Sequence, residues 1–289
     1  MNRLLEWLNA GLLITDGAWG TELQRRGLRP GTTPDTWNLT HPDEVEGVAR
    51  SYAEAGSQVI LTNTFRANAV AMKETSEAEL DAINRAGVEL SRRAAGRALV
   101  FASIGPLGKM LVSGEVTSEA ASAAFAAQAQ SLASAGADAL LIETMSDIEE
   151  ARLAVVVARR TGLPVIASFA FDSGKNKDRT MMGATPEAVA KAMVEAGASA
   201  VGANCGVGVA QSVAICQRLR AATDLPLWIK PNAGLPVLDG SVIHYETSAD
   251  FFASYYVALR DAGASFLGGC CGSTPEFVRA LVKAQKAAA

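Results

Sequence analysis

A segment that ends in Ala-Gly and continues as an apolar run recurs four times in this chain. The copies are "YAEAGSQVILTNTF" (52–65), "LASAGADALLIETM" (132–145), "MVEAGASAVGANCG" (193–206) and "LRDAGASFLGGCCG" (259–272). A glycine that follows a helix adopts the left-handed conformation at no steric cost, and five or six apolar residues after it are typical of a buried strand. The repeat predicts a helix, a tight turn and a buried strand as the unit of the fold.

Four further apolar runs have the character of buried strands. They are "GLLITDG" (11–17), "ALVFASIGP" (98–106), "LPVIASFAF" (163–171) and "LPLWIKPNAG" (225–234). Helical stretches with plausible caps lie between the runs, such as those that follow Thr117 and Thr185-Pro186. Apolar strands alternating with amphipathic helices indicate a parallel sheet covered by helices, and a count of eight favours closure. We expect a single α/β (β/α)8 TIM barrel, with a doubly wound open sheet as the alternative.

Composition supports one folded domain and argues against a nucleic-acid partner. The chain has 289 residues, of which 49% are hydrophobic and 19% charged, and no linker-like stretch divides it. This is enough apolar material for one large core, so we expect a single domain over residues 1–289. The formal net charge is -4 and no basic block is present. The electrostatic footprint of a phosphate-binding surface is therefore missing.

The sequence contains no membrane or export signal that we can identify. Glu6, Asn9 and Asp16 interrupt the apolar residues near the N-terminus before a signal-peptide core forms, and no segment approaches the roughly 20 apolar residues of a spanning helix. The chain has four cysteines without a repeated framework. We therefore expect a cytoplasmic protein with reduced thiols and no membrane partner. The oligomeric state cannot be inferred from these features.

Polar and small residues gather where the predicted strands end. The strand ends are Asp16-Gly17, Asn63-Thr64-Phe65, Gly105-Pro106, Glu143-Thr144, Asn204-Cys205-Gly206, Pro231-Asn232-Ala233-Gly234 and Gly269-Cys270-Cys271-Gly272. Barrel enzymes place their active sites at these carboxyl ends, so we expect the active site there. Cys205 ends the sixth strand, while Cys270 and Cys271 end the eighth. Inward-facing strand ends at that separation are close enough for their side chains to share one ion.

The four cysteines allow several interpretations. Cys216, in "SVAICQRLRAA", lies on the apolar side of a predicted helix and is expected to be a small core residue. A disulfide between Cys270 and Cys271 is disfavoured because neighbouring Cα atoms are only about 3.8 Å apart. A bridge from Cys205 to either of them would leave an odd thiol, and this alternative stays open beside the interpretation as a metal site.

Three converging thiolates suit Zn²⁺, which binds sulfur at about 2.3 Å and prefers four tetrahedral ligands. Three protein ligands leave one position open, as in catalytic zinc sites, and no paired C-x-x-C motif suggests a structural one. A zinc ion with three thiolates has a net charge of about -1 and is a poor Lewis acid, so a substrate thiol is the natural fourth ligand. The predicted reaction is attack by a zinc-bound thiolate on an electrophilic carbon.

Seven motifs distributed over the whole chain give it a family resemblance. They are "DGAWGTEL" (16–23), "ILTNTF" (60–65), "IGPLG" (104–108), "ETMSDIEEA" (143–151), "GANCG" (202–206), "PNAG" (231–234) and "GGCCGSTPE" (268–276). The chain resembles the homocysteine-binding zinc barrel of cobalamin-dependent methionine synthase, betaine–homocysteine methyltransferase and S-methylmethionine-dependent homocysteine methyltransferases. The resemblance implies a homocysteine S-methyltransferase of the EC 2.1.1 class that forms methionine, with Cys205, Cys270 and Cys271 as zinc ligands and the homocysteine sulfur as the fourth.

Homocysteine also carries an ammonium and a carboxylate, which need an acceptor and donors in the pocket. The resemblance places Asp16 and Glu143 near the amino group, and backbone N–H groups around Gly17 and Ala18 are candidates for the carboxylate. An isolated carboxylate at a strand end would otherwise serve as a helix cap. Asn232, in "PNAG", resembles the residue that occupies the fourth zinc position before substrate arrives, although a simple turn is the alternative.

The methyl donor is not determined by these residues. The folate-binding and cobalamin-binding domains of methionine synthase are not found in the 289 residues, so the donor is expected to be a free small molecule or a separate methylcorrinoid protein. Betaine-like donors need aromatic faces around the cation. Arg66 follows "NTF" where the betaine enzymes carry a donor-contacting tyrosine, and its charge would repel a quaternary ammonium. A non-catalytic accessory subunit that binds zinc and homocysteine is a further alternative.

The histidines and two tryptophans add little to this interpretation. His41 is expected at a helix start beside Pro42 and His244 in a loop, neither of them as a metal ligand. Trp19 and Trp37 fit either the wall of the pocket or the core.

Overall fold

The computed structural model describes residues 3–29, 31–239 and 242–288, and its centre is a parallel sheet of eight strands. The strands are β1 (Leu13–Ile14), β2 (Val59–Leu61), β3 (Leu99–Ile104), β4 (Ala139–Met145), β5 (Val165–Phe169), β6 (Ala200–Cys205), β7 (Leu227–Pro231) and β10 (Ala264–Leu267). Their order in the sheet is β1-β10-β7-β6-β5-β4-β3-β2. Each barrel strand from β2 to β10 therefore lies beside the next one along the chain, and β1 pairs with β10 from the other end of the chain.

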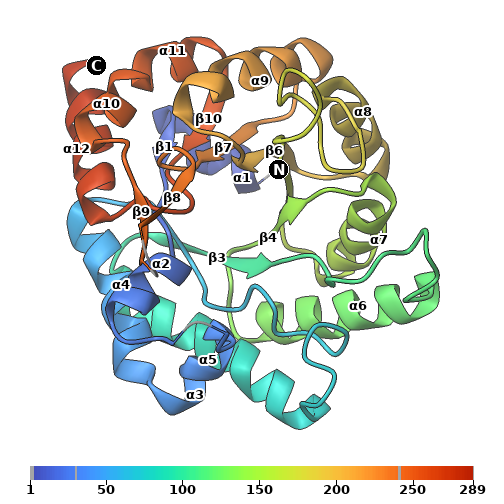
Figure 1. Ribbon diagram of the computed structural model, residues 1–289. Helices are drawn as coiled ribbons and strands as arrows, with labels where there is room; N and C mark the ends of the chain where they lie inside the picture. Colours follow the sequence, from blue (N-terminus) through green and yellow to red (C-terminus); the bar gives the residue numbers. More distant parts are fainter. Residues whose placement is uncertain (1–2, 30, 240–241, 289) are drawn as a thin grey trace.

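The two outer strands of this order also meet. Thr15, directly after β1, forms a parallel bridge with Val59 of β2, and the Gln58 N–H donates to the Ile14 carbonyl at 2.7 Å. The sheet therefore closes on itself (Figure 1). The predicted single (β/α)8 TIM barrel is confirmed, and the closure excludes the doubly wound open sheet.

Helices surround the barrel in chain order (Figure 1). The outer helices are α4 (Pro42–Ala55), α5 (Glu77–Ala95), α6 (Ser118–Ser134), α7 (Ile148–Ala158), α8 (Pro186–Ala196), α9 (Val209–Ala222), α10 (Ala249–Ser254), α11 (Tyr256–Asp261) and α12 (Pro275–Ala287). The shorter helices are α1 (Arg3–Trp7), α2 (Gly20–Arg25) and α3 (Trp37–Thr40), with 3₁₀ turns at Leu8–Ala10, Pro34–Thr36 and Arg159–Thr161. Across the described ranges, every helix is too short or too polar to cross a membrane.

The local signals that predicted these helices act as expected. The Thr117 side chain accepts the Ala120 N–H and the Thr185 side chain accepts the Ala188 N–H, so each caps the first turn of its helix. Gly56 ends α4 with φ of 100° and Gly197 ends α8 with φ of 83°. Both glycines have the left-handed conformation that lets the chain turn directly into the next strand.

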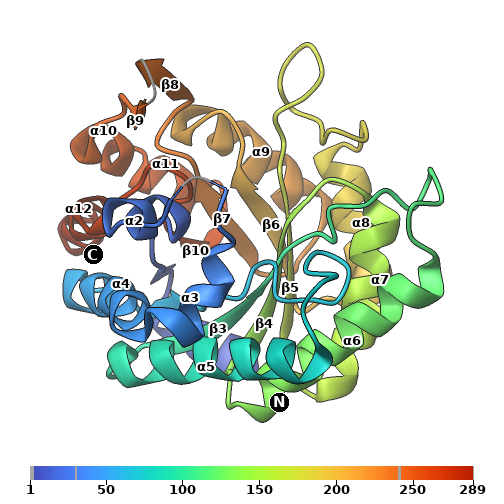
Figure 2. The same ribbon diagram turned by 60° about the horizontal axis from the view of Figure 1, so that its bottom comes forward.

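The strands bury side chains on both faces, as a parallel barrel requires. Residues that face outward pack against the helices in the larger core. Residues that face inward form a second core, the barrel interior, composed of Leu4, Leu13, Val59, Leu61, Phe101, Ala139, Leu141, Ile166, Ala200, Trp228 and Phe266. Leu4 belongs to α1, so this helix closes the N-terminal end of the barrel, opposite to the end where β8 and β9 lie (Figure 2).

A two-stranded hairpin interrupts the repeat after β7. Its antiparallel strands are β8 (Pro236–Asp239) and β9 (Val242–Tyr245), and His244 pairs with Val237. The expectation that His244 lies in a loop was therefore wrong. The dipeptide Asp239-Gly240 between two short runs is a hairpin signal, which the longer barrel period obscured. His41, as expected, lies directly before α4.

Candidate functional site

Two strand ends bring three thiols together at the C-terminal mouth of the barrel. Cys205 is the last residue of β6, and Cys270 and Cys271 follow β10, with only β7 between those two strands. The sulfur atoms of Cys205 and Cys270 are 3.2 Å apart, and all three sulfur atoms lie within 4.8 Å of one another. Each is a free thiol, so no disulfide joins them. Cys216, by contrast, is fully buried in α9, as expected of a core residue.

The chemistry of this cluster fits a soft metal ion. It offers three sulfur donors close enough to share one ion, and it is the one such group of His, Cys, Asp or Glu side chains in the described part of the chain. Hydrogen bonds from Cys205 and Cys270 lower the pKa of the Cys271 thiol, while hydrogen bonding to Cys270 and Cys271 raises the pKa of Cys205. The cluster therefore favours one thiolate that is stabilised by its neighbours, and the three side chains together can hold a metal.

The backbone that presents Cys205 is strained and is held by its neighbour Asn204. Cys205 has φ of 60° and Thr144, at the end of β4, has φ of 62°, in the left-handed region that costs a non-glycine residue about 1–3 kcal/mol. The Asn204 Oδ1 accepts the Thr144 N–H at 2.9 Å and the Ser168 hydroxyl at 2.7 Å. Its Nδ2 donates to the Thr144 Oγ1 at 2.7 Å and to the Cys205 sulfur at 3.4 Å.

Asn232 joins the two loops that carry the cysteines. Its Oδ1 accepts the Cys271 N–H at 3.0 Å, its Nδ2 donates to the Gly206 carbonyl at 2.9 Å, and its own N–H donates to the Cys205 carbonyl at 3.1 Å. Both polar atoms of the side chain thus have protein partners next to the thiols. The structure places Asn232 between the two cysteine loops, with contacts to both that the sequence did not suggest, and its role as a zinc ligand stays a prediction.

The "GGCCG" turn depends on glycine at two places. A Cβ on Gly268 would overlap Thr15 and Asp16, so glycine is needed for the close approach of this turn to the end of β1. Gly272 has φ of 81° and lies against the Tyr245 ring of the hairpin, which leaves no room for a side chain. Burial and the charges of the thiols raise the pKa of Tyr245 to about 12, so this phenol stays protonated beside them.

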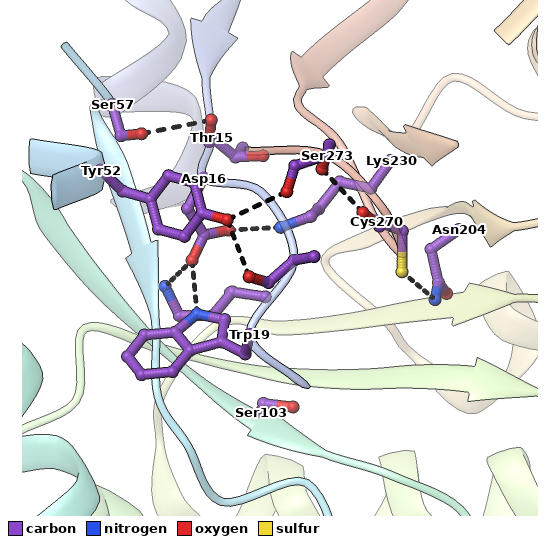
Figure 3. Close-up of polar contacts among 12 residues, drawn as sticks. Thr15, Asp16, Trp19, Tyr52, Ser57, Ser103, Asn204, Lys230, Cys270 and Ser273 are labelled. Atoms are coloured by element: carbon purple, nitrogen blue, oxygen red, sulfur yellow. Dashed lines mark hydrogen bonds and ion pairs between the residues drawn. The ribbon is translucent and has the colours of Figure 1, made fainter. Parts of the chain in front are cut away.

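Asp16 is fully buried next to the thiols and has several partners (Figure 3). Its Oδ2 accepts the Leu61 N–H and the Trp19 Nε1–H, each at 2.8 Å, and its Oδ1 forms an ion pair with Lys230. Trp19 therefore lies at the site through this bond, whereas Trp37 is a buried core residue that stacks on His41.

Lys230 is the residue of this site that sequence reasoning missed. It lies in β7, its side chain is 2% exposed, and its ammonium lies 5.8 Å from the centre of the Trp228 ring. A lysine is almost never buried without a partner, so a single lysine within the apolar run "LPLWIKPNAG" was the available signal. Figure 3 shows its ammonium bonded to Asp16 beside Cys270.

Glu143, near the end of β4, is also buried and bonded to another side chain. The Ser103 hydroxyl donates to its Oε1 at 2.5 Å. Burial and then the negative charge of Cys270 raise the pKa of Glu143 to about 7. The carboxyl group therefore takes up a proton more readily than an exposed glutamate does.

Gly17 and Ala18 lie in the segment between β1 and α2. The Ala18 N–H already donates to the Ser273 carbonyl at 3.2 Å, and the Tyr52 hydroxyl donates to the Ala18 carbonyl at 2.7 Å. The Tyr52 ring also fills the space that a Cβ on Gly17 would need. The structure places both residues beside Asp16, and their contact with a carboxylate stays a prediction. Arg66 is exposed, and its N–H donates to the buried Asp35.

Known proteins resemble this chain over nearly its full length. The sequence profile of the family described as Homocysteine S-methyltransferase matches residues 13–285. Methionine synthase of Mycobacterium leprae is 30% identical over 97% of this chain, and the chain spans 25% of that protein's length. Homocysteine S-methyltransferase of Escherichia coli is 29% identical, with 93% of this chain and 94% of the relative covered.

A solved structure agrees with these matches. The homocysteine methyltransferase MmuM from Escherichia coli in its metallated form superposes with a TM-score of 0.80 at 27% identity, with 97% of this chain and 99% of the other covered. The oxidized form of the same protein gives a TM-score of 0.81. The fold, the sequence profile and the relatives agree, and the chain belongs to the homocysteine S-methyltransferase family of methyltransferase enzymes.

Proposed function

We propose that this protein is a zinc-dependent homocysteine S-methyltransferase that forms methionine, and that residues 1–289 act as one homocysteine-binding domain. The observation that carries the proposal is the convergence of three free thiols within 4.8 Å of one another at the barrel mouth, beside the buried carboxyl group of Glu143. A methyl transfer to sulfur needs the acceptor as a thiolate, because the thiol itself is a weak nucleophile. The site requires reduced cysteines, which suits the cytoplasm.

Cys205, Cys270 and Cys271 would hold the zinc ion, and together they provide three of its four ligands. Zinc bound there would stabilise the deprotonated form of the substrate thiol at neutral pH. Asn204 and Asn232 keep the cysteine loops in place through their hydrogen bonds to both loops. We further propose that Asn232, whose side chain already contacts the Cys271 backbone, supplies the fourth ligand before homocysteine arrives.

The remaining site residues bind the amino-acid end of the substrate in this proposal. Glu143 in its ionised form accepts hydrogen bonds from the substrate ammonium, next to the neighbouring carboxylate of Asp16. The backbone around Gly17 and Ala18 contributes to the carboxylate site. Orienting both ends fixes the sulfur with respect to the incoming methyl group, which is a large part of what an enzyme contributes to a two-substrate reaction.

The methyl donor in this proposal is a free small molecule. Similarity to a homocysteine S-methyltransferase over 94% of its length favours this interpretation. The second candidate is a separate methylcorrinoid protein, which the 30% identity to methionine synthase favours. Arg66, exposed in the turn that follows β2, argues against cationic donors such as betaine, since like charges repel.

A donor panel tests the proposal. Zinc-loaded protein with homocysteine is incubated separately with betaine, S-methylmethionine, methyl-folate, methylcobalamin and a methylated corrinoid protein, and methionine is quantified. We expect methionine from one small donor. Methionine formed only with the methylated corrinoid protein would contradict a small-molecule donor and support the second candidate. Homocysteine binding without product from any donor would contradict catalysis and favour an accessory subunit.

A further inference from the structure

A cavity of about 460 Å³ lies between α5, α6 and the loop that follows β2. The two helices are neighbours on the outside of the barrel (Figure 1). Small side chains form much of the cavity wall, namely Ala67, Ala69, Ala120, Ala123, Ala124 and Ala127. Ligand sites have volumes of roughly 300–1,000 Å³, so the cavity has the size of a small-molecule site. It shares no lining residue with the site of the three thiols.

The side-chain amides of Asn68 and Gln128 line this cavity, and each has one polar atom without a partner in the part of the chain that the structure describes. The Asn68 Oδ1 accepts the N–H groups of Val70 at 3.1 Å and Ala71 at 2.9 Å, which leaves Nδ2 as a free donor. The Gln128 Nε2 donates to the Thr64 carbonyl at 2.7 Å, which leaves Oε1 as a free acceptor. These bonds determine which end of each amide is free.

The free donor and the free acceptor are both buried, since Asn68 and Gln128 are each 2% exposed. A buried polar atom without a hydrogen bond is costly, and native proteins contain few of them. Among residues 3–29, 31–239 and 242–288, the other such side-chain atoms belong to Thr15, Thr21 and Trp228, none of which lines the cavity. Two atoms of complementary type in the lining of one cavity therefore point to a ligand that pairs with both.

The chemistry of the lining restricts the class of ligand. The charged side chains that line the cavity in the described ranges are Glu77 and Asp81, both of them acidic, which disfavours an anion. The Asn68 donor needs an acceptor, and the Gln128 acceptor needs a donor. A carboxamide supplies a carbonyl oxygen and an N–H group in one planar unit, whereas a ketone or an ester supplies the acceptor alone.

We propose that the cavity between α5 and α6 binds a neutral small molecule through a carboxamide edge. The ligand accepts a hydrogen bond from the Asn68 Nδ2, donates one to the Gln128 Oε1, and packs its apolar part against the alanine wall. Gln128 also bonds Thr64, directly after β2, so one hydrogen bond joins this second site to the β2 side of the barrel mouth. The inference is independent of the zinc site and of homocysteine methylation.

Titration of the ¹⁵N-labelled protein with benzamide tests the proposal, because the side-chain amide of Asn68 gives its own NMR signals. The comparison ligands are acetophenone, which has the carbonyl but no N–H donor, and benzoate, which is an anion. We expect benzamide to shift the Asn68 signals in a saturable way with a Kd of about 1 mM. Acetophenone should bind about 5- to 10-fold more weakly, since it leaves the Gln128 acceptor unpaired, and benzoate should bind more weakly still.

Two variants locate the ligand within the cavity. Asn68→Asp keeps the oxygen that caps the loop but replaces the free donor, so benzamide should bind at least about 10-fold more weakly. The side-chain signals of Gln128 follow binding in this variant. Ala127→Trp, at an exposed position of the wall, fills the cavity and should abolish binding even if Asn68→Asp fails to fold. Asn176→Asp, at an exposed asparagine after β5, is the matched control and should keep the wild-type Kd.

Three results would overturn the proposal. The first is the absence of a saturable shift of the Asn68 signals with benzamide. The second is equal affinity for benzamide and acetophenone, because the carboxamide edge would then not be recognised. The third is wild-type affinity for benzamide in Asn68→Asp or in Ala127→Trp, which would place the ligand elsewhere. Binding is measured without methyl transfer, so each of these results leaves the proposed function unchanged.

Discussion

The barrel interior has two buried layers of opposite chemistry, a few residues apart on the same strands. At the base, Trp7, Phe101, Trp228 and Phe266 pack with ring centroids 5.3–5.9 Å apart. At the mouth, Asp16, Glu143 and Lys230 are buried beside the three cysteines. Aromatic contacts stabilise a fold beyond their area burial, whereas a buried ion pair contributes about nothing net against apolar residues of similar size. The difference teaches that the base provides stability and the mouth provides chemistry.

The largest effect on stability is expected at the base. Phe101→Ala removes a fully buried ring that touches three other aromatic rings, so unfolding should cost about 3–5 kcal/mol less. Urea denaturation measures this change in the free energy of unfolding. Thiol binding by the folded fraction should be the same as in the wild type. Loss of thiol binding without loss of stability would show that the base takes part in the chemistry.

The mouth should respond differently to loss of its charges. Lys230→Met alone leaves Asp16 buried and uncompensated, which should destabilise the protein by about 3–5 kcal/mol. Asp16→Asn/Lys230→Met removes both charges and should lose less than about 1 kcal/mol. Both free energies come from the same urea titrations. A double variant as unstable as the single one would mean that the pair is there for stability.

Substitution of Asn204, at the mouth, should lower the affinity for zinc more than it lowers the stability of the fold. Asn204→Ala releases the strained Thr144 and Cys205 backbones and should lower zinc affinity about 10- to 100-fold. Competition with a chromophoric chelator measures this affinity, and Cys216→Ala serves as a control with unchanged affinity. Unchanged zinc affinity in Asn204→Ala would contradict the proposal that Asn204 supports the metal ligands.

The smallest effect is one of pH. Glu143 must be ionised to accept an ammonium, and its pKa is raised to about 7, so homocysteine binding should weaken about tenfold between pH 8 and pH 6 through this group. For stability the sign is opposite, because an acid with a raised pKa favours the folded state when protonated. That contribution is complete below pH 4.5 and is lost as the pH rises through about 7.

Glu143→Gln supplies the comparison for this profile. The binding curve of the variant should lack the tenfold step and retain only the dependence that comes from the substrate thiol. Binding profiles of the same slope in the wild type and in Glu143→Gln would contradict the role of Glu143.

Local patterns predicted most of the fold and half of the site. Ala-Gly turns and apolar runs are signals within a few residues, so the eight strands and the converging Cys205, Cys270 and Cys271 followed from them. The Asp16–Lys230 pair joins residues 214 positions apart, and only the closed barrel brings them together. The clamping bonds of Asn204 likewise depend on side-chain geometry at three strand ends, which composition and periodicity do not encode.

Metal content and methyl transfer, measured on the same preparations of wild type and Cys271→Ser, test the central claim most directly. The account predicts about one zinc ion per chain in the wild type, together with formation of methionine from homocysteine by the donor that the panel identifies. Cys271→Ser should lose most of the zinc and at least about 100-fold of the methyl-transfer rate. The expected loss is larger than that for Asn204→Ala, because Cys271 is itself a proposed ligand whereas Asn204 only orients one. A wild type that methylates homocysteine without bound metal, or a Cys271→Ser protein that retains full activity, would contradict it.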